Sequence, residues 1–207
     1  MTNNNITGIV VSGVGGQGVL LASNLIGNAA MLSGLDARVT ETHGLSQRGG
    51  SLISFVRVGR EVHAPLIDPG SADYIISMEL LEGLRSIVYS GRHTIHIANL
   101  SKVLPATVLS GKAKYPLVEE IKAKIASSAQ DAFFLDAASL AIQAGKVLYQ
   151  NVVLVGFFAG ISNVAEPKFY QDAIREFVPA KSVEVNLKAF ELGLNASQEA
   201  KSRLQGL

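Results

Sequence analysis

Short apolar segments alternate with longer helical ones along most of the chain. The first of them, Ile6 to Val11, is β-branched and leads through a glycine-rich turn into an apolar stretch from Val19 to about Ser33. Gly34 has the position of a residue that ends a helix, and Asp36 to Glu41 reads as a second strand. The opening of the chain therefore predicts a strand–helix–strand unit.

The next segment predicts a β-hairpin inserted after the second strand. Ser51 to Val58 alternates between apolar and polar residues, Gly59 and Arg60 form a turn, and Glu61 to Ala64 is expected to return as the second strand. Asp68-Pro69-Gly70 then supplies another turn.

The rest of the chain repeats the alternation of strand and helix. The expected strands are Tyr74–Ser77, His93–Ala98 and Phe133–Leu135, and the expected helices are Glu79–Tyr89, one beginning at Pro116, Ala137–Ala144, Val152–Ser162 and Val183–Leu204. Such alternation favours a mostly parallel sheet that is covered on both faces. We therefore expect residues 1–207 to form one α/β domain, a doubly wound Rossmann-like sheet with helices on both faces, an inserted β-hairpin and a C-terminal helix from about residue 183.

Composition narrows the possible functions. Eighteen basic and 17 acidic residues give a formal net charge of +1, so neither nucleic acid nor a membrane is an expected partner. The absence of cysteine excludes disulfides, thiol nucleophiles and thiolate-ligated iron–sulfur clusters. A start of Met-Thr-Asn-Asn-Asn without signal-peptide features predicts a cytoplasmic protein. The high mean hydropathy of +0.29 suggests that another subunit covers some apolar surface.

The first candidate site is the glycine loop between the first strand and the first helix. Gly13, Gly15 and Gly18 match the G-x-G-x-x-G fingerprint, whose glycines allow a tight turn, a close approach to phosphate and helix packing. Glu41, at the end of the second strand, is a candidate to hold a ribose. The alternative is that the glycines only permit a sharp turn and a close fit to a neighbouring chain.

The second candidate site is the polar loop from Thr42 to Gly50. It places the His43 imidazole, the Arg48 guanidinium and exposed backbone amides at one sheet edge, which suits a carboxylate or a phosphate. In a doubly wound sheet this loop should lie near the first one. The alternative is a surface turn capped by its own side chains.

Other polar residues give weaker signals. His93 and His96 are three apart on a predicted strand, so they should point to opposite faces and form no metal pair. An acidic group, Asp68, Asp73, Glu79 and Glu82, is explained by a turn and an exposed helix face. We expect no catalytic acid, base or nucleophile and no metal ligand in this chain.

The two loops together resemble a known family. Gly-Val-Gly-Gly-Gln-Gly-Val at 13–19 followed by Glu-Thr-His-Gly-Leu-Ser-Gln-Arg-Gly-Gly-Ser at 41–51 is similar to the gamma-type domain of the pyruvate and 2-oxoacid:ferredoxin oxidoreductases. The Ser-Gln-Arg-Gly-Gly-Ser form looks closest to the beta subunit of indolepyruvate oxidoreductases, and the resemblance extends from Ile6 to about Phe190. The sequence departs from the family pattern at residues 79–85 and 96–100. This departure affects the substrate assignment more than the fold.

The resemblance implies an accessory subunit that is inactive alone. A larger partner subunit would hold thiamine diphosphate and iron–sulfur clusters, decarboxylate a 2-oxoacid such as indolepyruvate, reduce ferredoxin and form an acyl-coenzyme A. This chain would help to accommodate the anionic coenzyme A. The candidate cofactor-binding residues are Gly13, Gly15, Gly16, Gln17, Gly18, His43, Gln47, Arg48, Gly49 and Gly50. Two alternatives remain, a free-standing dinucleotide-binding oxidoreductase and a non-catalytic scaffold subunit.

Overall fold

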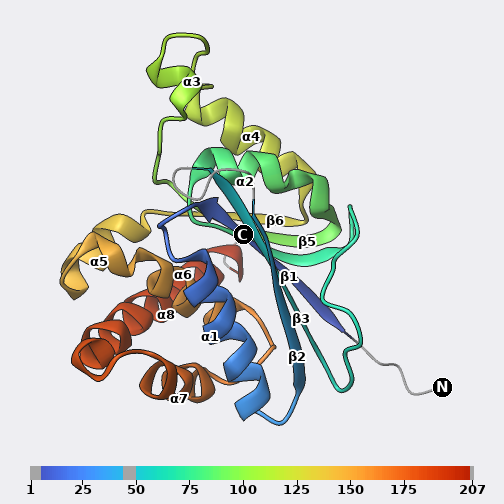
Figure 1. Cartoon of the computed structure of the whole chain (residues 1–207), viewed down its shortest axis with the longest axis vertical. Coiled ribbons are helices and arrows are strands. Elements are labelled where there is room, and N and C mark those ends of the chain that lie inside the picture. Colours follow the sequence, from blue (N-terminus) through green and yellow to red (C-terminus); the bar gives the residue numbers. More distant parts are fainter. Residues whose placement is uncertain (1–5, 44–49, 206–207) are drawn as a thin grey trace.

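A single six-stranded sheet runs through the molecule (Figure 1). The computed structural model describes residues 6–43 and 50–205. The strands are β1 (Thr7–Val14), β2 (Asp36–His43), β3 (Ser51–Gly59), β4 (Ala72–Ser77), β5 (Ser90–Asn99) and β6 (Asp131–Leu135), in the order β2-β3-β1-β4-β5-β6. β1, β4, β5 and β6 are parallel, whereas β3 is antiparallel to both β1 and β2. The predicted α/β sheet, mostly parallel, is confirmed.

The antiparallel insertion differs from the predicted hairpin. The expected return strand at Glu61–Ala64 is wrong, because β3 pairs with β2 on one side and β1 on the other. Phe55 and Val56 are adjacent residues that point to opposite faces and are both buried, as in an interior strand. The segment after β3 is held by side chains instead. Asp36 accepts a hydrogen bond from the Val62 amide at 2.9 Å, and Arg57 donates one to the Ala64 carbonyl at 3.1 Å.

Helices cover the two faces unequally (Figure 1). The larger layer contains α1 (Val19–Leu32), α5 (Ala137–Ala144), α6 (Gln150–Ile161), α7 (Pro167–Phe177) and α8 (Val183–Gln205); the smaller contains α2 (Leu80–Ser86) and α4 (Val118–Ser128). Single 3₁₀ turns lie at η1 (Ile87–Tyr89), η2 (Val147–Tyr149) and η3 (Ala180–Ser182), and α3 (Ala106–Leu109) stands apart from both layers. β1 alternates between the faces, since Ile9 and Val11 enter the larger core and Val10 the smaller one. In the described part of the chain, no helix is long and apolar enough to cross a membrane.

Local sequence signals predicted some helix ends and not others. Gly34, with φ 89°, ends α1 as predicted, and its amide donates to the Met31 carbonyl at 3.0 Å while the Leu35 amide reaches Ala30 at 3.1 Å. The whole of α7 was missed, although Pro167 at its first turn is a common start signal.

α6 and α8 form the centre of the larger core, and glycines let them approach closely. α6 is buried almost all round, as its apolar sequence predicts. A β-carbon added at Gly156 would overlap the Phe190 carbonyl of α8, and one at Gly193 would overlap the Val153 carbonyl of α6. The two backbones therefore touch at positions where only glycine fits.

We expect Gly193→Ala to lower the free energy of unfolding by about 1–3 kcal/mol, because the added methyl group must push the two helices apart. Urea denaturation measures the effect. Asn195→Ala, at an exposed position two residues further along α8, is the matched control and should unfold at the wild-type midpoint or above. Equal midpoints for both variants would contradict the close approach.

Candidate functional site

The two glycine loops meet at the carboxyl end of β1. The Gly15 amide donates a hydrogen bond to the Gly50 carbonyl at 3.0 Å, which joins residues that are 35 positions apart in sequence. The second loop therefore lies beside the first at its Gly50 end, as predicted. Of the other predicted residues of this loop, Gln47, Arg48 and Gly49 lie outside the described residues, as does the side chain of His43.

Gln17 holds the first loop in shape. Its side-chain oxygen accepts a hydrogen bond from the Val14 amide at 2.8 Å, and its side-chain nitrogen donates to the Met78 carbonyl at 3.5 Å. The Gln17 amide donates to the Val14 carbonyl at 3.0 Å and closes a turn. Gly13 fits tightly below, since an added β-carbon would lie 2.8 Å from Val19 and 2.9 Å from Met78. The amides of residues 14, 15 and 17 are thus already engaged inside the protein.

The later glycines of the loop serve two different purposes. Gly18 has φ 77°, and an added β-carbon would collide with the Asn151 side-chain amide of α6. Asn151 also donates to the Gly18 carbonyl at 3.3 Å. Gly16, with φ 101°, is exposed and has open space around it. Gly18 therefore permits close packing, whereas Gly16 permits a turn that leaves the loop surface accessible.

Helix N-termini give this edge a positive electrostatic character. α1 begins at Val19 and α6 at Gln150, and the Asn151–Gly18 contact brings the two starts together. Neither helix has a side-chain cap or an acidic residue in its first turn, so the positive end of each dipole is not neutralised there. The arrangement suits an anion at the exposed surface of the loop.

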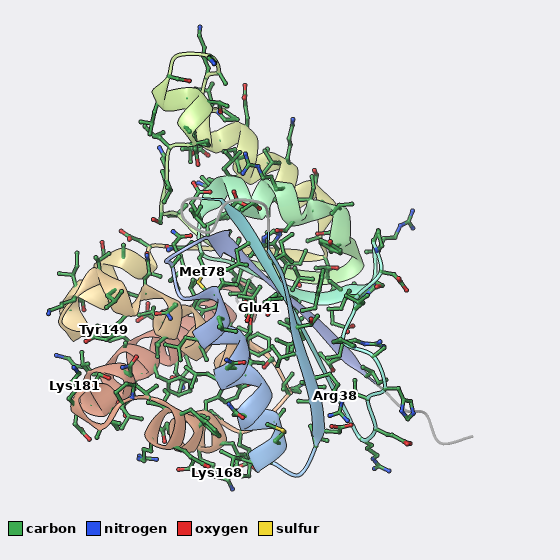
Figure 2. All side chains as sticks on the ribbon, in the orientation of Figure 1. Arg38, Glu41, Met78, Tyr149, Lys168 and Lys181 are labelled. Carbon is green, nitrogen blue, oxygen red and sulfur yellow. The ribbon has the colours of Figure 1, made fainter. Side chains whose placement is uncertain are left out.

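The position of β2 argues against a dinucleotide site. In the Rossmann fold the acidic residue that holds the ribose ends the strand next to β1. Here β3 separates the two strands, so Glu41 on β2 lies two strand spacings, about 10 Å, from β1 (Figure 2). The inserted strand therefore disfavours the free-standing dinucleotide-binding oxidoreductase.

Two glutamates of the α2 turn are buried, and the prediction of an exposed acidic face is wrong for them. Glu79 is 1% and Glu82 is 2% exposed. Glu79 caps α2 by accepting a hydrogen bond from the Glu82 amide at 2.9 Å. The Glu82 carboxylate pairs with the Arg85 guanidinium and accepts a hydrogen bond from the Ser51 hydroxyl at 2.5 Å. Because Ser51 directly follows Gly50, Glu82 positions the end of the second loop.

Asn99 is a further polar residue that sequence reasoning did not select. It is fully buried at the carboxyl end of β5. Its side-chain nitrogen donates to the Met78 carbonyl at 3.1 Å and to the Gln150 side chain at 3.0 Å, and its oxygen accepts from the Ala137 amide at 3.2 Å. Asn99 thus ties the starts of α5 and α6 to the same sheet edge. An asparagine directly after an apolar strand was the available signal.

The prediction that the two histidines of β5 point to opposite faces is wrong, because their neighbours Asp73 and Ser77 lie on the same face of β4 and an irregularity in the β4–β5 pairing breaks the alternation. His93 is exposed, whereas His96 is fully buried and its Nε2 lies 3.1 Å from the Ser77 hydroxyl. Burial lowers the pKa of His96 from 6.5 to about 3. Within the described ranges, no three histidine or acidic side chains are grouped to hold a metal ion.

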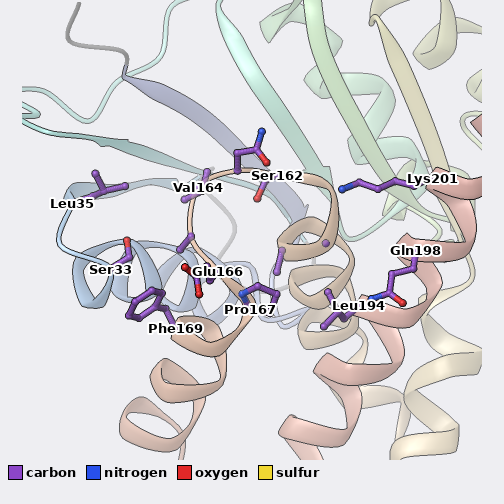
Figure 3. A pocket seen from close by; sticks show the side chains of 14 residues that line it. Ser33, Leu35, Ser162, Val164, Glu166, Pro167, Phe169, Leu194, Gln198 and Lys201 are labelled. Carbon is purple, nitrogen blue, oxygen red and sulfur yellow. The ribbon is translucent and has the colours of Figure 1, made fainter. Parts of the chain in front are cut away.

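A separate hollow of about 710 Å³ lies at the other end of α1 (Figure 3). Ser33, Phe169, Leu194 and Gln198 are among its lining residues, and none of the candidate cofactor-binding residues is. Since α1 has 14 residues, this hollow is roughly 20 Å from the glycine loops along the helix. It is not part of the candidate site.

The fold is an α/β domain in which two glycine loops and two helix N-termini meet at one edge of the sheet. Residues 8–196 match the family described as pyruvate ferredoxin/flavodoxin oxidoreductase, and the chain belongs to that family. It is 44% identical over 195 residues to the indolepyruvate oxidoreductase subunit IorB of Pyrococcus horikoshii, with 92% of this chain and 96% of that protein covered.

Two solved structures share the fold. The gamma subunit of a keto/oxoacid ferredoxin oxidoreductase from Geobacter sulfurreducens superposes with a TM-score of 0.69 at 21% identity, covering 93% of this chain and 99% of that one. The 2-oxoglutarate:ferredoxin oxidoreductase of Magnetococcus marinus superposes with a TM-score of 0.74 at 16% identity. The match covers 95% of this chain and 32% of that one, so the other chain extends well beyond the matched region.

We expect the stability of the protein to fall as the pH decreases from about 6.5 towards 3. In this window the unfolded chain protonates His96 and the folded protein does not, so protonation favours unfolding. The contribution approaches about 1.4 kcal/mol per pH unit. Urea unfolding of the wild type and of His96→Gln across this window measures it, and the variant should lose this part of the slope. His63→Gln, at an exposed position, is the control. Identical pH profiles for all three proteins would contradict the role of His96.

Proposed function

We propose that this chain is the accessory subunit of a thiamine diphosphate-dependent 2-oxoacid:ferredoxin oxidoreductase that acts on indolepyruvate or other arylpyruvates. The 44% identity to a named indolepyruvate oxidoreductase subunit over nearly the full length of both chains supports this substrate class. The observation that carries the proposal is the hydrogen bond between Gly15 and Gly50, which joins the two loops at the edge where we propose that an anion binds.

The redox chemistry belongs to a larger partner subunit. A chain without cysteine does not supply the thiolates that iron–sulfur clusters require. Thiamine diphosphate and the clusters would therefore be in the larger subunit, which decarboxylates the 2-oxoacid and passes two electrons to ferredoxin. This chain would orient coenzyme A and cover the active site of the larger subunit. It would move no proton and form no covalent bond.

The contribution of this chain would be to hold coenzyme A, the acyl acceptor. Its phosphates need donors that are fixed before it arrives. The exposed turn at Gly16 and the first amides of α1 offer backbone donors, and the predicted loop residues His43, Gln47 and Arg48, with Gly49 and Gly50, would add side-chain and backbone donors. Arg48 is the group best suited to pair with a phosphate.

A scaffold without any ligand is the second candidate. The engagement of the amides of residues 14, 15 and 17 within the protein favours it, because those groups serve packing rather than binding. Reconstitution tests the proposed assembly, and the Arg48→Ala variant described below separates a subunit that binds coenzyme A from a scaffold. The purified chain is mixed with its thiamine-bearing subunit, and reduction of ferredoxin is followed with indolepyruvate and coenzyme A. We expect turnover only with both subunits and an acyl-coenzyme A product. Full activity of the larger subunit alone, or of this chain alone, would refute the proposal.

We expect Arg48→Ala to raise the KM of the complex for coenzyme A about 10- to 100-fold, because a charge-assisted hydrogen bond contributes roughly 1.5–3 kcal/mol. The KM for the 2-oxoacid should stay unchanged. Arg60→Ala, at an exposed turn after β3, is the matched control and should behave as wild type. If Arg48→Ala leaves the KM for coenzyme A unchanged, Arg48 has no part in the site.

A further inference from the structure

A projecting arm, residues 100–117, extends from the smaller helix layer. It leaves the sheet after β5, forms α3 at its tip and returns to α4. Figure 1 shows α3 beyond every other helix, at the top of the view. We propose that this arm docks the chain onto the larger subunit by entering an apolar groove bordered by carboxylates. The inference rests on the proposed function and adds to it the surface through which the two subunits associate.

The arm exposes several large apolar side chains. Leu104 is 45% exposed before α3, Leu109 is 71% exposed at the end of α3, and Leu117 is 68% exposed just before α4. Large apolar side chains gathered on a projecting segment mark an interaction surface. Leu100 and Tyr115 at the base of the arm pack against the smaller layer, whereas these three leucines remain exposed.

The positive charge of the arm indicates that acidic residues border the groove on the larger subunit. Lys102, Lys112 and Lys114 are exposed, and residues 100–117 contain no aspartate or glutamate. The arm thus carries three positive charges in a chain whose formal net charge is +1. A groove rimmed by carboxylates would complement this distribution and speed the encounter of the subunits.

The tip has a defined shape before it meets a partner. Gly111, with φ 72°, follows α3, and its amide donates to the Val108 carbonyl at 3.0 Å. The Lys112 amide donates to the Thr107 carbonyl at 2.9 Å, which completes a Schellman motif. A preformed tip loses little conformational entropy on binding, so the apolar contacts contribute more fully to affinity.

The base of the arm is fixed to the helix that also supports the candidate site. The buried Glu79 carboxylate accepts hydrogen bonds from the Val103 amide at 3.0 Å and from the Tyr115 hydroxyl at 2.8 Å, and so holds both sides of the arm. Three residues along the chain, Glu82 bonds Ser51 at the end of the second glycine loop. The arm and the loops therefore share one support. The partner that uses the loops is for this reason the one expected to hold the arm.

The test measures association of the purified chain with its larger subunit by calorimetry, with ferredoxin reduction as a second readout. Leu104→Asp combined with Leu109→Asp should raise the Kd at least 10-fold. Leu66→Asp is the matched control, since Leu66 is 60% exposed on the segment between β3 and β4. It should leave the Kd within 2-fold of wild type. Lys112→Glu with Lys114→Glu should weaken association at low salt and flatten its dependence on ionic strength. Circular dichroism and urea midpoints confirm that each variant is folded.

The outcomes separate this inference from the proposed function. If the wild-type subunits associate and turn over, and the double leucine variant binds as tightly as the Leu66→Asp control, the arm inference alone is overturned. If the wild-type subunits neither associate nor turn over, the proposed function fails and the inference with it. Two further results would also overturn the inference: self-association of the isolated chain, or binding to phosphatidylglycerol vesicles, that is lost in the double leucine variant while subunit association is retained.

Discussion

The placement of β3 between β1 and β2 is the constraint on which the rest of the site depends. β3 begins beside the carboxyl end of β1 and runs antiparallel to it, so Gly50, just before β3, accepts the hydrogen bond of Gly15 there. The same strand moves Glu41 to the outer edge of the sheet. The inserted strand β3 thus separates Glu41 from the position where a dinucleotide site holds the ribose. It also places the end of the second loop beside the first.

Two buried carboxylates connect the second glycine loop and the arm to α2. Glu79 and Glu82 are taken out of water, which is costly unless each oxygen finds a donor. The donors come from Ser51 and Arg85 for Glu82, and from the base of the arm for Glu79. Because these partners are distant in sequence, the carboxylates fix the position of the arm relative to the second glycine loop. The proposed anion-binding edge and the proposed docking element are therefore parts of one supported unit.

The sequence was sufficient for features that depend on local physics. Apolar periodicity predicted the parallel strands and most helices, and Gly34 predicted the end of α1 because few other residues adopt its φ of 89°. It was insufficient where the deciding partner is remote. Glu82 looked like an exposed helix residue because its partner Ser51 is 31 positions away, and β3 was paired with the wrong segment because strand pairing is not encoded locally. Of the candidate site, the proximity of the two loops was predicted, whereas the packing of Asn151 on Gly18 was not.

The central claim is that the two joined loops face the chemistry of another subunit. Hydrogen–deuterium exchange of this chain, alone and in the complex with its larger subunit, with and without coenzyme A, tests it most directly. We expect amides in residues 13–21 and 43–51 to exchange more slowly in the complex and more slowly still with coenzyme A. Unchanged exchange in both loops, with protection only around the hollow near Ser33 and Phe169, would contradict it.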